Sequence, residues 1–328
     1  MNVKFLSLVG ILTSLVNSNS PLVAQQNYTL TNNQTHYIRL KIENDVLVFR
    51  DKTDRYFSSG LKFNYVSDTK VGSSNLLNKI FPRLKEGDNH YGYSLASNMF
   101  TPLNNSEAII QGDRPYCGWV YGGITNTSND SKKGIRFSTE YSIGALGPIT
   151  KQDIMQKTMH KIIERPQPKG WKNQIANDIA LNLSFVGEKY IFKPLDNLEL
   201  IGIVETNIGT VTNYMGFGGT LRVGWFENYF KRILPVSKQK NWQVFAFVRP
   251  VLRIIADNSL LQGGILNYHK SPYVISRDDI SHWYMETEFG YSLSYKSLNM
   301  TYSQNFRTSE FKDAKGMFWG AFTVTTAF

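Results

Sequence analysis

A short amphipathic segment carries the side chains best suited to acid–base chemistry. Residues 149–164 (ITKQDIMQKTMHKIIE) have helical periodicity, and Gln152, Gln156 and His160 share one side of that helix because they are four residues apart. A neutral imidazole can take a proton from water near neutral pH. A histidine beside an apolar stripe is also common in purely structural helices, so this pattern alone leaves both roles open.

The limits of this helix are also indicated by the sequence. Pro148 is well placed as a first helical residue, and Pro166 and Pro168 stop the helix after residue 164. An apolar stripe follows the same periodicity, and it is formed by Ile154, Met155, Thr158, Met159, Ile162 and Ile163. We expect this helix to lie outside the main sheet, since it interrupts a chain of strand-like segments.

A second polar cluster is typical of a hard cation site. It consists of residues 43–45 (END), Asp51, residues 53–56 (TDRY) and residues 58–60 (SSG). Carboxylates, amides and backbone carbonyls close together suit Ca²⁺, although the spacing is not that of an EF-hand. An Asn-Asp pair after a strand is most often only a turn, so metal binding stays one of two interpretations.

A third cluster, residues 113–119 (DRPYCGW), combines charge, a rigid turn and aromatic rings. We expect Asp113, Arg114 and Tyr116 to contact the substrate; a strand-initiating corner is an equally good interpretation of this cluster. Cys117 has no histidine near it in sequence and is a poor candidate nucleophile. As the chain's one cysteine, it excludes a disulfide scaffold and a cysteine-based zinc site.

The N-terminus predicts export. Lys4 is followed by the apolar run 5–16 (FLSLVGILTSLV) and by polar and small residues up to Ala24, which is the pattern of a secretory signal peptide. We expect a signal peptide over residues 1–24, with cleavage between 18 and 24, and one mature domain over 25–328. The run is too short to span a bilayer, which needs about 20 residues.

Alternation of apolar and polar residues predicts a transmembrane antiparallel β-barrel. Strong segments occur at 37–43, 61–65, 135–143, 179–185 and 285–295, and weaker ones bring the count to about twelve strands, an even number as in closed bacterial barrels. A soluble β-sandwich also alternates. Two features favour the barrel: the final amphipathic strand 317–328, which ends in Phe328, and a set of strand-flanking aromatics, namely Tyr37, Trp119, Tyr121, Trp225, Trp242, Trp283 and Trp319.

Composition agrees with this class. Hydrophobic residues make up 41% of the 328 residues, and the 44 aromatics exceed the needs of a soluble α/β enzyme. The formal net charge of +10 suggests an anionic partner, although the surplus can also solvate loops. No phosphate-cradling glycine loop or nucleic-acid motif is present, so we expect no nucleotide or nucleic-acid binding. No Gly-x-Ser-x-Gly elbow is present, which argues against a serine acyl-enzyme.

Eight motifs in order resemble the outer-membrane lipid A 3′-O-deacylase family. They are END (43–45), TDRYFSSG (53–60), NMFTP (98–102), DRPYCGWVY (113–121), EYSIGALGP (140–148) with the His160 helix, PKGW (168–171), LLQGG (260–264) and RTSEF (307–311). The resemblance implies a twelve-stranded barrel in the outer membrane. It also implies a Ca²⁺-dependent hydrolase that removes the 3′ acyloxyacyl chain from the lipid A of lipopolysaccharide.

The same resemblance implies roles for individual residues. His160 matches the family's catalytic histidine and would be the general base for a water, and Gln156 would help to hold that water or the substrate. Asn44 and Asp45 match the pair at the metal site, with Asn44 also counted among the catalytic groups. Ser58 stands where many members have a threonine hydroxyl in the site, so the hydroxyl is kept and Ser58 is also counted among the catalytic groups.

Partners and rival functions follow from this interpretation. We expect a monomer, surrounded by outer-membrane lipids, and expect exposed lysines to meet the lipid A phosphates; the candidates are Lys132, Lys133, Lys157, Lys161 and Lys169. An outer-membrane phospholipase or another lipid-modifying barrel is the alternative function. A passive channel is the weaker rival, because it would have no use for the histidine helix.

Overall fold

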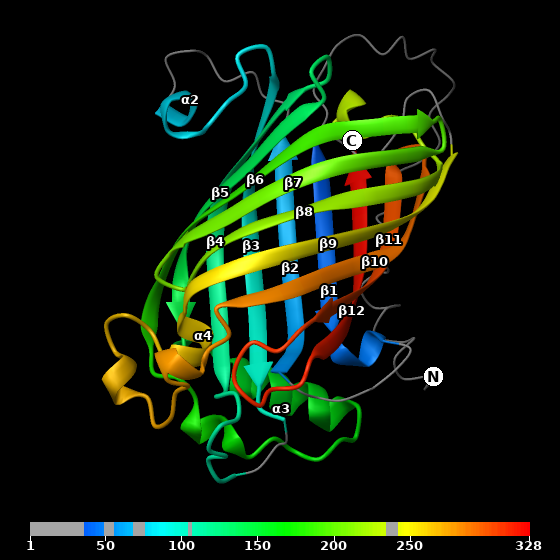
Figure 1. Cartoon of the computed structure of the whole chain (residues 1–328). Coiled ribbons are helices and arrows are strands. Elements are labelled where there is room, and N and C mark those ends of the chain that lie inside the picture. Colours follow the sequence, from blue (N-terminus) through cyan, green and yellow to red (C-terminus); the bar gives the residue numbers. More distant parts are fainter. Residues whose placement is uncertain (1–35, 49–55, 68–75, 104–106, 234–241) are drawn as a thin grey trace, which may run out of the picture.

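Twelve antiparallel strands form one closed barrel (Figure 1). The computed structural model describes residues 36–48, 56–67, 76–103, 107–233 and 242–328. The strands are β1 (Tyr37–Asn44), β2 (Tyr56–Ser67), β3 (Asp88–Thr101), β4 (Cys117–Asp130), β5 (Ile135–Leu146), β6 (Asp178–Leu195), β7 (Leu198–Gly209), β8 (Thr212–Trp225), β9 (Trp242–Asn258), β10 (Trp283–Tyr295), β11 (Leu298–Arg307) and β12 (Met317–Ala327). Each strand pairs with its neighbours in sequence, and β1 closes the barrel on β12 with Tyr37 opposite Ala327. The predicted barrel and its strand number are confirmed.

The helices of the described residues are few and short. They are α2 (Leu76–Ile80), α3 (Gln152–Ile162) and α4 (Ser259–Gln262), with 3-10 helices at Asp45–Leu47, Pro148–Thr150, Gly170–Asn173, Tyr229–Lys231, Tyr268–Lys270 and Arg277–Asp279. In the described residues, no helix has both the length and the apolar character needed to cross a membrane. The predicted signal peptide, residues 1–24, lies outside the described residues.

The alternation along the strands separates a charged lumen from an apolar outer wall. Lys62 contacts Glu140 at 2.7 Å inside the barrel, and Arg253 binds both Glu205 and Glu286, at 2.6 and 2.9 Å. The outward neighbours of such residues are apolar and exposed; examples are Tyr93, Leu95, Ile143, Ile208 and Tyr291. An apolar exterior around a polar interior is the pattern of a barrel embedded in lipid.

The two ends of the barrel differ. One end, called the terminal end here, carries the start of β1, the end of β12, α2 and the tight turns after Leu195 and Tyr295. The other, called the α3 end, carries α3, α4 and the long link 147–177 (Figure 1). At the α3 end the lumen is filled by a hydrophobic cluster that includes Phe57, Phe100 and Trp319. In the terminal half a cavity of about 330 Å³ remains, lined by charged side chains that include Arg39 and Arg249.

Only some of the aromatic residues predicted to flank the strands lie at the outer surface. Trp225, Trp242 and Trp283 are 47–65% exposed at strand ends, where rings at a membrane interface belong. Trp119, Tyr121 and Trp319 instead face the lumen, since they occupy the inward positions of their strands; the Trp319 indole N–H donates to Glu43 at 3.0 Å. Tyr37 is buried. The terminal strand agrees with its pattern, because Phe322 and Phe328 are exposed while Ala321 is buried.

Candidate active site

Helix α3 begins three residues later than its periodicity predicts. Gly147 (φ 86°) lets the chain turn sharply out of β5, and Pro148 starts a 3-10 turn rather than the helix itself. Lys151 then adopts a left-handed conformation (φ 57°), which separates that turn from α3 at Gln152. At the other end, the helix stops at Ile162, before Pro166.

The polar face of α3 is buried and its predicted apolar stripe is largely outside. Gln152, Gln156 and His160 are 3–6% exposed, whereas Ile154 and Ile162 are 55% and 43% exposed. Burying amides and an imidazole is costly unless they find hydrogen-bond partners, so this orientation requires polar groups opposite the helix. The barrel wall and the segment that follows α3 supply them.

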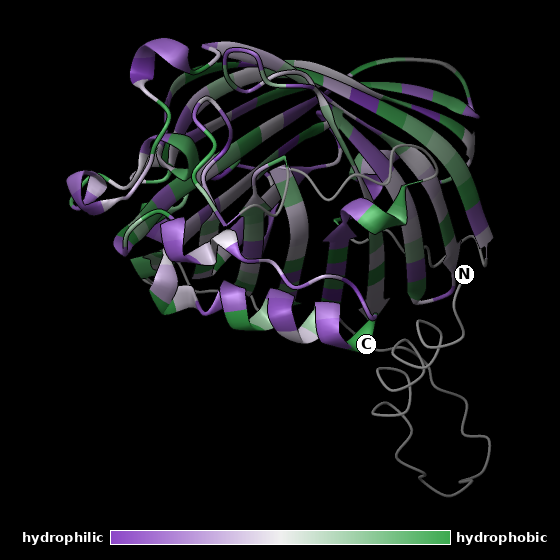
Figure 2. Ribbon diagram, turned by 90° about the horizontal axis from the view of Figure 1, so that it is seen from below, coloured by the Kyte–Doolittle hydropathy of each residue, from purple (hydrophilic) through white to green (hydrophobic). Residues whose placement is uncertain are grey.

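Helix α3 lies against the outer surface of the barrel, not across its mouth (Figure 2). The Gln152 amide donates to the hydroxyl of Ser97 at 2.8 Å. Ser97 lies on the same face of β3 as the exposed Leu95, so this contact is on the outside of the wall. Gly118 on β4 allows the close approach, since a Cβ there would lie 2.2 Å from the Thr150 hydroxyl oxygen.

The hydrogen bond of His160 fixes its tautomer. Its Nδ1 lies 2.6 Å from the carbonyl oxygen of Pro166, and a carbonyl oxygen can only accept a hydrogen bond. The proton of the neutral ring must therefore be on Nδ1, which leaves Nε2 as the acceptor nitrogen. That arrangement is the one a general base needs.

The side-chain amide of Gln156 is held through its oxygen atom. The indole N–H of Trp171 donates to Oε1 of Gln156 at 2.6 Å. Trp171 is itself packed in a buried cluster with Met99 and Tyr116, against which Met155 of α3 also lies. The Nε2 of Gln156 is buried and has no hydrogen-bond partner among the described residues.

Asn44 and Asp45 lie where β1 ends at the α3 end of the barrel. The Asn44 Oδ1 accepts from the backbone N–H of Val46 at 2.9 Å, and its Nδ2 donates to the carbonyl of Ser58 at 2.8 Å. Asn44 therefore caps the short 3-10 helix after it and ties β1 to β2. Asp45, the first residue of that 3-10 helix, is only 3% exposed.

A β-bulge positions Ser58. In the pairing of β2 with β3, Phe57 lies opposite Phe100 and Ser59 opposite Met99, so Ser58 is an extra residue. The bulge places the Ser58 hydroxyl 2.6 Å from that of Thr101, which is fully buried.

The outer face of β3 provides partners for several of these groups. Ser97, Met99 and Thr101 alternate along that face, and they contact Gln152, the Trp171 cluster and Ser58 respectively. Asn44 is tied to the same strand pair through the Ser58 carbonyl. That His160 and these residues act together stays a prediction.

The described residues contain no group of three or more His, Cys, Asp or Glu side chains able to hold a metal ion. Asp51 and residues 53–55, which belong to the predicted cation cluster, lie outside the described residues. Asn44 and Asp45 contribute an amide and a carboxylate, which are oxygen ligands that Ca²⁺ accepts.

The third predicted cluster divides between the two faces of the wall. Arg114 is fully buried on the lumen side, where it lies 4.5 Å from the Phe100 ring and forms an ion pair with Glu310. Tyr116 lies on the α3 side, with its ring 4.9 Å from that of Trp171. Asp113 accepts from the backbone N–H groups of Leu103 and Arg114 at 2.8 and 2.7 Å, so its carboxylate shapes the turn. Substrate contact by these three residues stays a prediction.

The pKa values of Asp113, which precedes β4, and of Glu310, between β11 and β12, are shifted from their ordinary values. Burial raises the pKa of the Asp113 carboxyl above its ordinary value, and the two backbone N–H groups only partly offset that rise. Burial alone would also raise the pKa of Glu310, but the guanidinium groups of Arg114 and Arg307 outweigh it and lower the pKa below 4.5. Glu310 is therefore held as a carboxylate between two cations.

The predicted phosphate-binding lysines are not all on one side. Lys157, Lys161 and Lys169 are exposed on or just after α3. Lys132 and Lys133 lie in the β4–β5 turn, at the terminal end, and so cannot meet the same headgroup as the α3 lysines. The spacing of lysines along the sequence does not show which end of the barrel a turn occupies.

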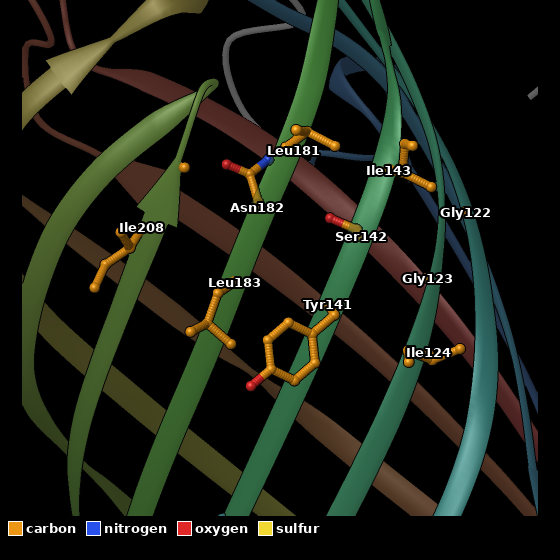
Figure 3. A pocket seen from close by; sticks show the side chains of 11 residues that line it. Gly122, Gly123, Ile124, Tyr141, Ser142, Ile143, Leu181, Asn182, Leu183 and Ile208 are labelled. Atoms are coloured by element: carbon orange, nitrogen blue, oxygen red, sulfur yellow. The ribbon is translucent and has the colours of Figure 1, made fainter. Parts of the chain in front are cut away.

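An apolar hollow lies in the outer wall across β4 to β7 (Figure 3). It measures about 670 Å³, and its lining includes Ile143, Leu181, Leu183 and Ile208. The lining contains no carboxylate, amine or imidazole, so this hollow can hold apolar chains but offers no group for acid–base chemistry.

A family model described as outer membrane protein LpxR matches residues 8–328. The chain belongs to the LpxR family. It is accordingly an outer-membrane protein, in agreement with the barrel and its apolar exterior. No curated protein sequence matches the chain.

Solved structures similar to this LpxR-family chain include LpxR from Salmonella typhimurium. It is 19% identical, with a TM-score of 0.71, and the match covers 89% of this chain and 100% of that one. This likeness shows the fold. The β domain of the Bordetella autotransporter BrkA matches with a TM-score of 0.43 and 9% identity, over 90% of this chain and 98% of that one, which is too low for any inference.

Some residues of the site were not singled out from the sequence. Thr101 and Trp171 lie in motifs that the family resemblance noted, NMFTP and PKGW, but nothing in those motifs indicates a partner for either side chain. Their partners, Ser58 and Gln156, are 43 and 15 residues away in sequence. The pairing of β2 with β3 brings Ser58 to Thr101, and the return of the chain after α3 brings Trp171 to Gln156.

Proposed function

We propose that this protein hydrolyses the ester that attaches the 3′ acyloxyacyl chain to lipid A in the outer membrane. Membership of the LpxR family supports a lipid A deacylase. The observation that carries the proposal is His160, a buried imidazole on the helix that packs against the outer face of the wall, with its Nδ1 directed at the Pro166 carbonyl. A soluble substrate would be served by a pocket open to water, whereas this site meets molecules that lie within the membrane.

The position of the site along the barrel agrees with such a substrate. In outer-membrane barrels the short turns face the periplasm and the long links face outward, which puts α3 at the level of the outer leaflet. Lipid A is the amphiphile of that leaflet. Its sugar would lie at the rim, its acyl chains would follow the apolar wall, and Lys157 and Lys161 are exposed nearby to meet its phosphates.

The chemistry would need one water and no covalent enzyme intermediate. Nε2 of His160 accepts a proton from water as the water oxygen attacks the ester carbonyl carbon. The C–O bond to the sugar then breaks, and the sugar oxygen takes the proton back from the imidazolium. The products are a fatty acid and a free hydroxyl. Gln156, one helical turn from His160, would donate through Nε2 to the attacking water or to the substrate.

We propose a Ca²⁺ requirement at the end of β1. Asp45 and Asn44 would hold the ion, and the oxygen chemistry of both side chains fits a hard cation. When bound, the ion would supply positive charge to stabilise the oxyanion that develops on the ester carbonyl. Ser58 bonds Thr101 through its hydroxyl and accepts from Asn44 through its backbone carbonyl. It would therefore hold Asn44 in place beside the substrate.

The test is the mass spectrum of lipid A from cells that express the protein. We expect the mass of the 3′ acyloxyacyl chain to be lost, and we expect His160→Ala to abolish the loss. His269→Ala is the matched control, since His269 is an exposed histidine in a link at the same end of the barrel and should leave activity unchanged. Unchanged lipid A together with fatty acid released from phospholipids would contradict the proposal and favour an outer-membrane phospholipase.

We also propose that the protein acts as a monomer. Every group assigned above comes from a single chain, so no second copy is needed to complete the site. Activity per protein molecule that stays constant as the protein-to-lipid ratio is varied is the expected result; activity per molecule that rises with that ratio would contradict it.

A further inference from the structure

The segment that returns along α3, residues 166–171, contacts both of the buried acid–base side chains. Pro166 accepts from His160 through its backbone carbonyl, and Trp171 donates to Gln156 through its indole. The segment accepts a hydrogen bond in the first contact and donates one in the second. Pro166 therefore leaves an acceptor atom on His160, and Trp171 leaves a donor group on Gln156.

We infer that Trp171 is a positioning residue, which sets the direction of the Gln156 side-chain amide. This inference rests on the proposed function, in which Gln156 acts as a donor toward water or substrate. A glutamine amide has two ends of similar size and can present either its oxygen or its NH₂ group after a half-turn. The indole N–H can only donate, so it selects the state in which Oε1 faces Trp171.

The surroundings make this selection strong. Gln156 is 4% exposed and Trp171 is 2% exposed, so water cannot readily replace the indole as a partner for Oε1. The reversed amide would place its NH₂ group against the indole N–H, leaving two donors facing each other in a buried place. The packing of Trp171 between Met99 and Tyr116 keeps the ring from moving aside.

The selected state has a visible consequence at the other end of the amide. The NH₂ group of Gln156 is buried without a hydrogen-bond partner among the described residues. Leaving a buried donor unsatisfied is costly in a resting protein, so an acceptor that arrives beside this NH₂ group gains a hydrogen bond. Trp171 thus holds a donor in readiness for a group that arrives with the substrate.

The test uses Trp171→Phe, which keeps an aromatic ring against Met99 and Tyr116 but removes the N–H. We expect kcat for lipid A deacylation to fall about tenfold, the size of one lost hydrogen bond to a reacting group, with KM nearly unchanged. Trp119→Phe is the matched control, because the indole N–H of Trp119 is buried and has no partner among the described residues. It should leave kcat unchanged.

A double-mutant cycle separates positioning from simple packing. If Trp171 acts through Gln156, adding Trp171→Phe to Gln156→Ala should cause no further loss of kcat. If the two losses multiply, the inference is wrong and Trp171 is only a packing residue. Should Trp171→Phe fold poorly, Trp171→His supplies a smaller ring with an N–H and should retain more activity than the phenylalanine variant.

A measurement without turnover keeps this inference distinct from the proposed function. The indole ¹H–¹⁵N signal of Trp171, identified by its absence in Trp171→Phe, should move and exchange faster with solvent in Gln156→Ala. An unchanged signal would overturn the inference even if lipid A is deacylated. Conversely, a shifted signal in a protein that leaves lipid A intact would contradict the proposed function and leave the indole–amide contact standing.

Discussion

His160 donates its Nδ1 proton to the backbone carbonyl of Pro166, four residues after the end of α3, across 2.6 Å. A backbone carbonyl only accepts and is not removed by a side-chain mutation, so this contact selects the Nδ1–H form of the neutral ring. We predict that ¹⁵N spectra of histidine-labelled protein at pH 8 show a protonated Nδ1 and an unprotonated Nε2 for His160. The reverse tautomer would remove the proposed base.

The close approach of α3 to the wall depends on Gly118. A Cβ at this position would lie 2.2 Å from the Thr150 hydroxyl oxygen and 2.6 Å from Cγ of Gln152, so Gly118→Ala must push α3 outward. We predict a fall in deacylation of about a hundredfold, since displacement of a catalytic group by about 1 Å can cost that much. The barrel should still fold, as judged by its heat-modifiable electrophoretic mobility.

Gly122 lies on the same face of β4, four residues after Gly118, and provides the control for that experiment. A Cβ there meets nothing closer than the Ser94 carbonyl oxygen at 3.7 Å, so Gly122→Ala should retain the wild-type rate. Equal losses in both variants would mean that any added side chain on β4 is harmful and that α3 seating is not the cause.

The hydroxyl pair of Ser58 and Thr101 gives a third prediction. Ser58→Ala removes one partner from a hydrogen bond in which Thr101 is fully buried, and the unsatisfied hydroxyl costs about 1–3 kcal/mol. We expect at least a tenfold fall in kcat for Ser58→Ala and near-normal activity for Ser58→Thr, which keeps the oxygen. A Thr101→Val variant should resemble Ser58→Ala; full activity in both would exclude a role for this pair.

The proposed cation site predicts a metal dependence that is separable from catalysis. Chelation should abolish deacylation, and Asp45→Asn should raise the Ca²⁺ concentration for half-maximal activity at least tenfold, because one carboxylate charge is lost. Asp153→Asn is a matched control, since Asp153 is on α3 and pairs with Lys157 at 3.4 Å. His160→Ala should still bind Ca²⁺ in calorimetry. Full activity in chelator would remove the metal from the proposal.

The buried ion pair at the α3 end predicts a defined pH dependence of stability. Glu310 has a folded-state pKa below its ordinary value of 4.5, held there by Arg114 and Arg307 after the opposing effect of burial. Its contribution is therefore complete above about pH 4.5 and is lost as the pH falls through the folded-state pKa. Glu310→Gln leaves the fully buried Arg114 without its carboxylate, and it should lower the free energy of unfolding by about 3–5 kcal/mol at pH 7.

Urea unfolding of wild type and Glu310→Gln between pH 7 and pH 2 measures this contribution. The difference between the two proteins should stay constant down to about pH 4.5 and shrink only below it. A difference that already shrinks above pH 5 would mean that the Glu310 pKa is raised, not lowered. Lys172→Ala provides a control at the same end, because the Lys172–Glu107 pair is exposed and should contribute little.

The barrel was predictable because its alternation is a local property. Each strand shows its own inward and outward faces, as Ile143 and Leu181 outside and Glu140 inside demonstrate, so twelve segments can be found without knowing how they pair. The row of Gln152, Gln156 and His160 was likewise visible, since helical spacing is local. Its orientation was not, because apolar residues usually turn inward.

What the sequence could not show depends on contacts made at a distance. The bulge at Ser58 arises only from its pairing with β3, and a run of two serines gives no sign of which one is extra. Ile154 and Ile162 face outward because the polar face of α3 packs on the wall and on the segment after the helix, which reverses the usual preference of a soluble protein. The partners of Ser58 and Gln156 likewise depend on the β2–β3 pairing and on the path of the chain after α3.

The hydrophobic cluster around Phe57, Phe100 and Trp319 occupies the lumen at the α3 end, whereas the proposed site lies on the exterior of the barrel. Encounter between this enzyme and its substrate would then be a two-dimensional event, governed by lateral diffusion of both molecules in one leaflet. Its rate would follow surface density and membrane fluidity. An effective inhibitor would first have to partition into the bilayer and approach sideways.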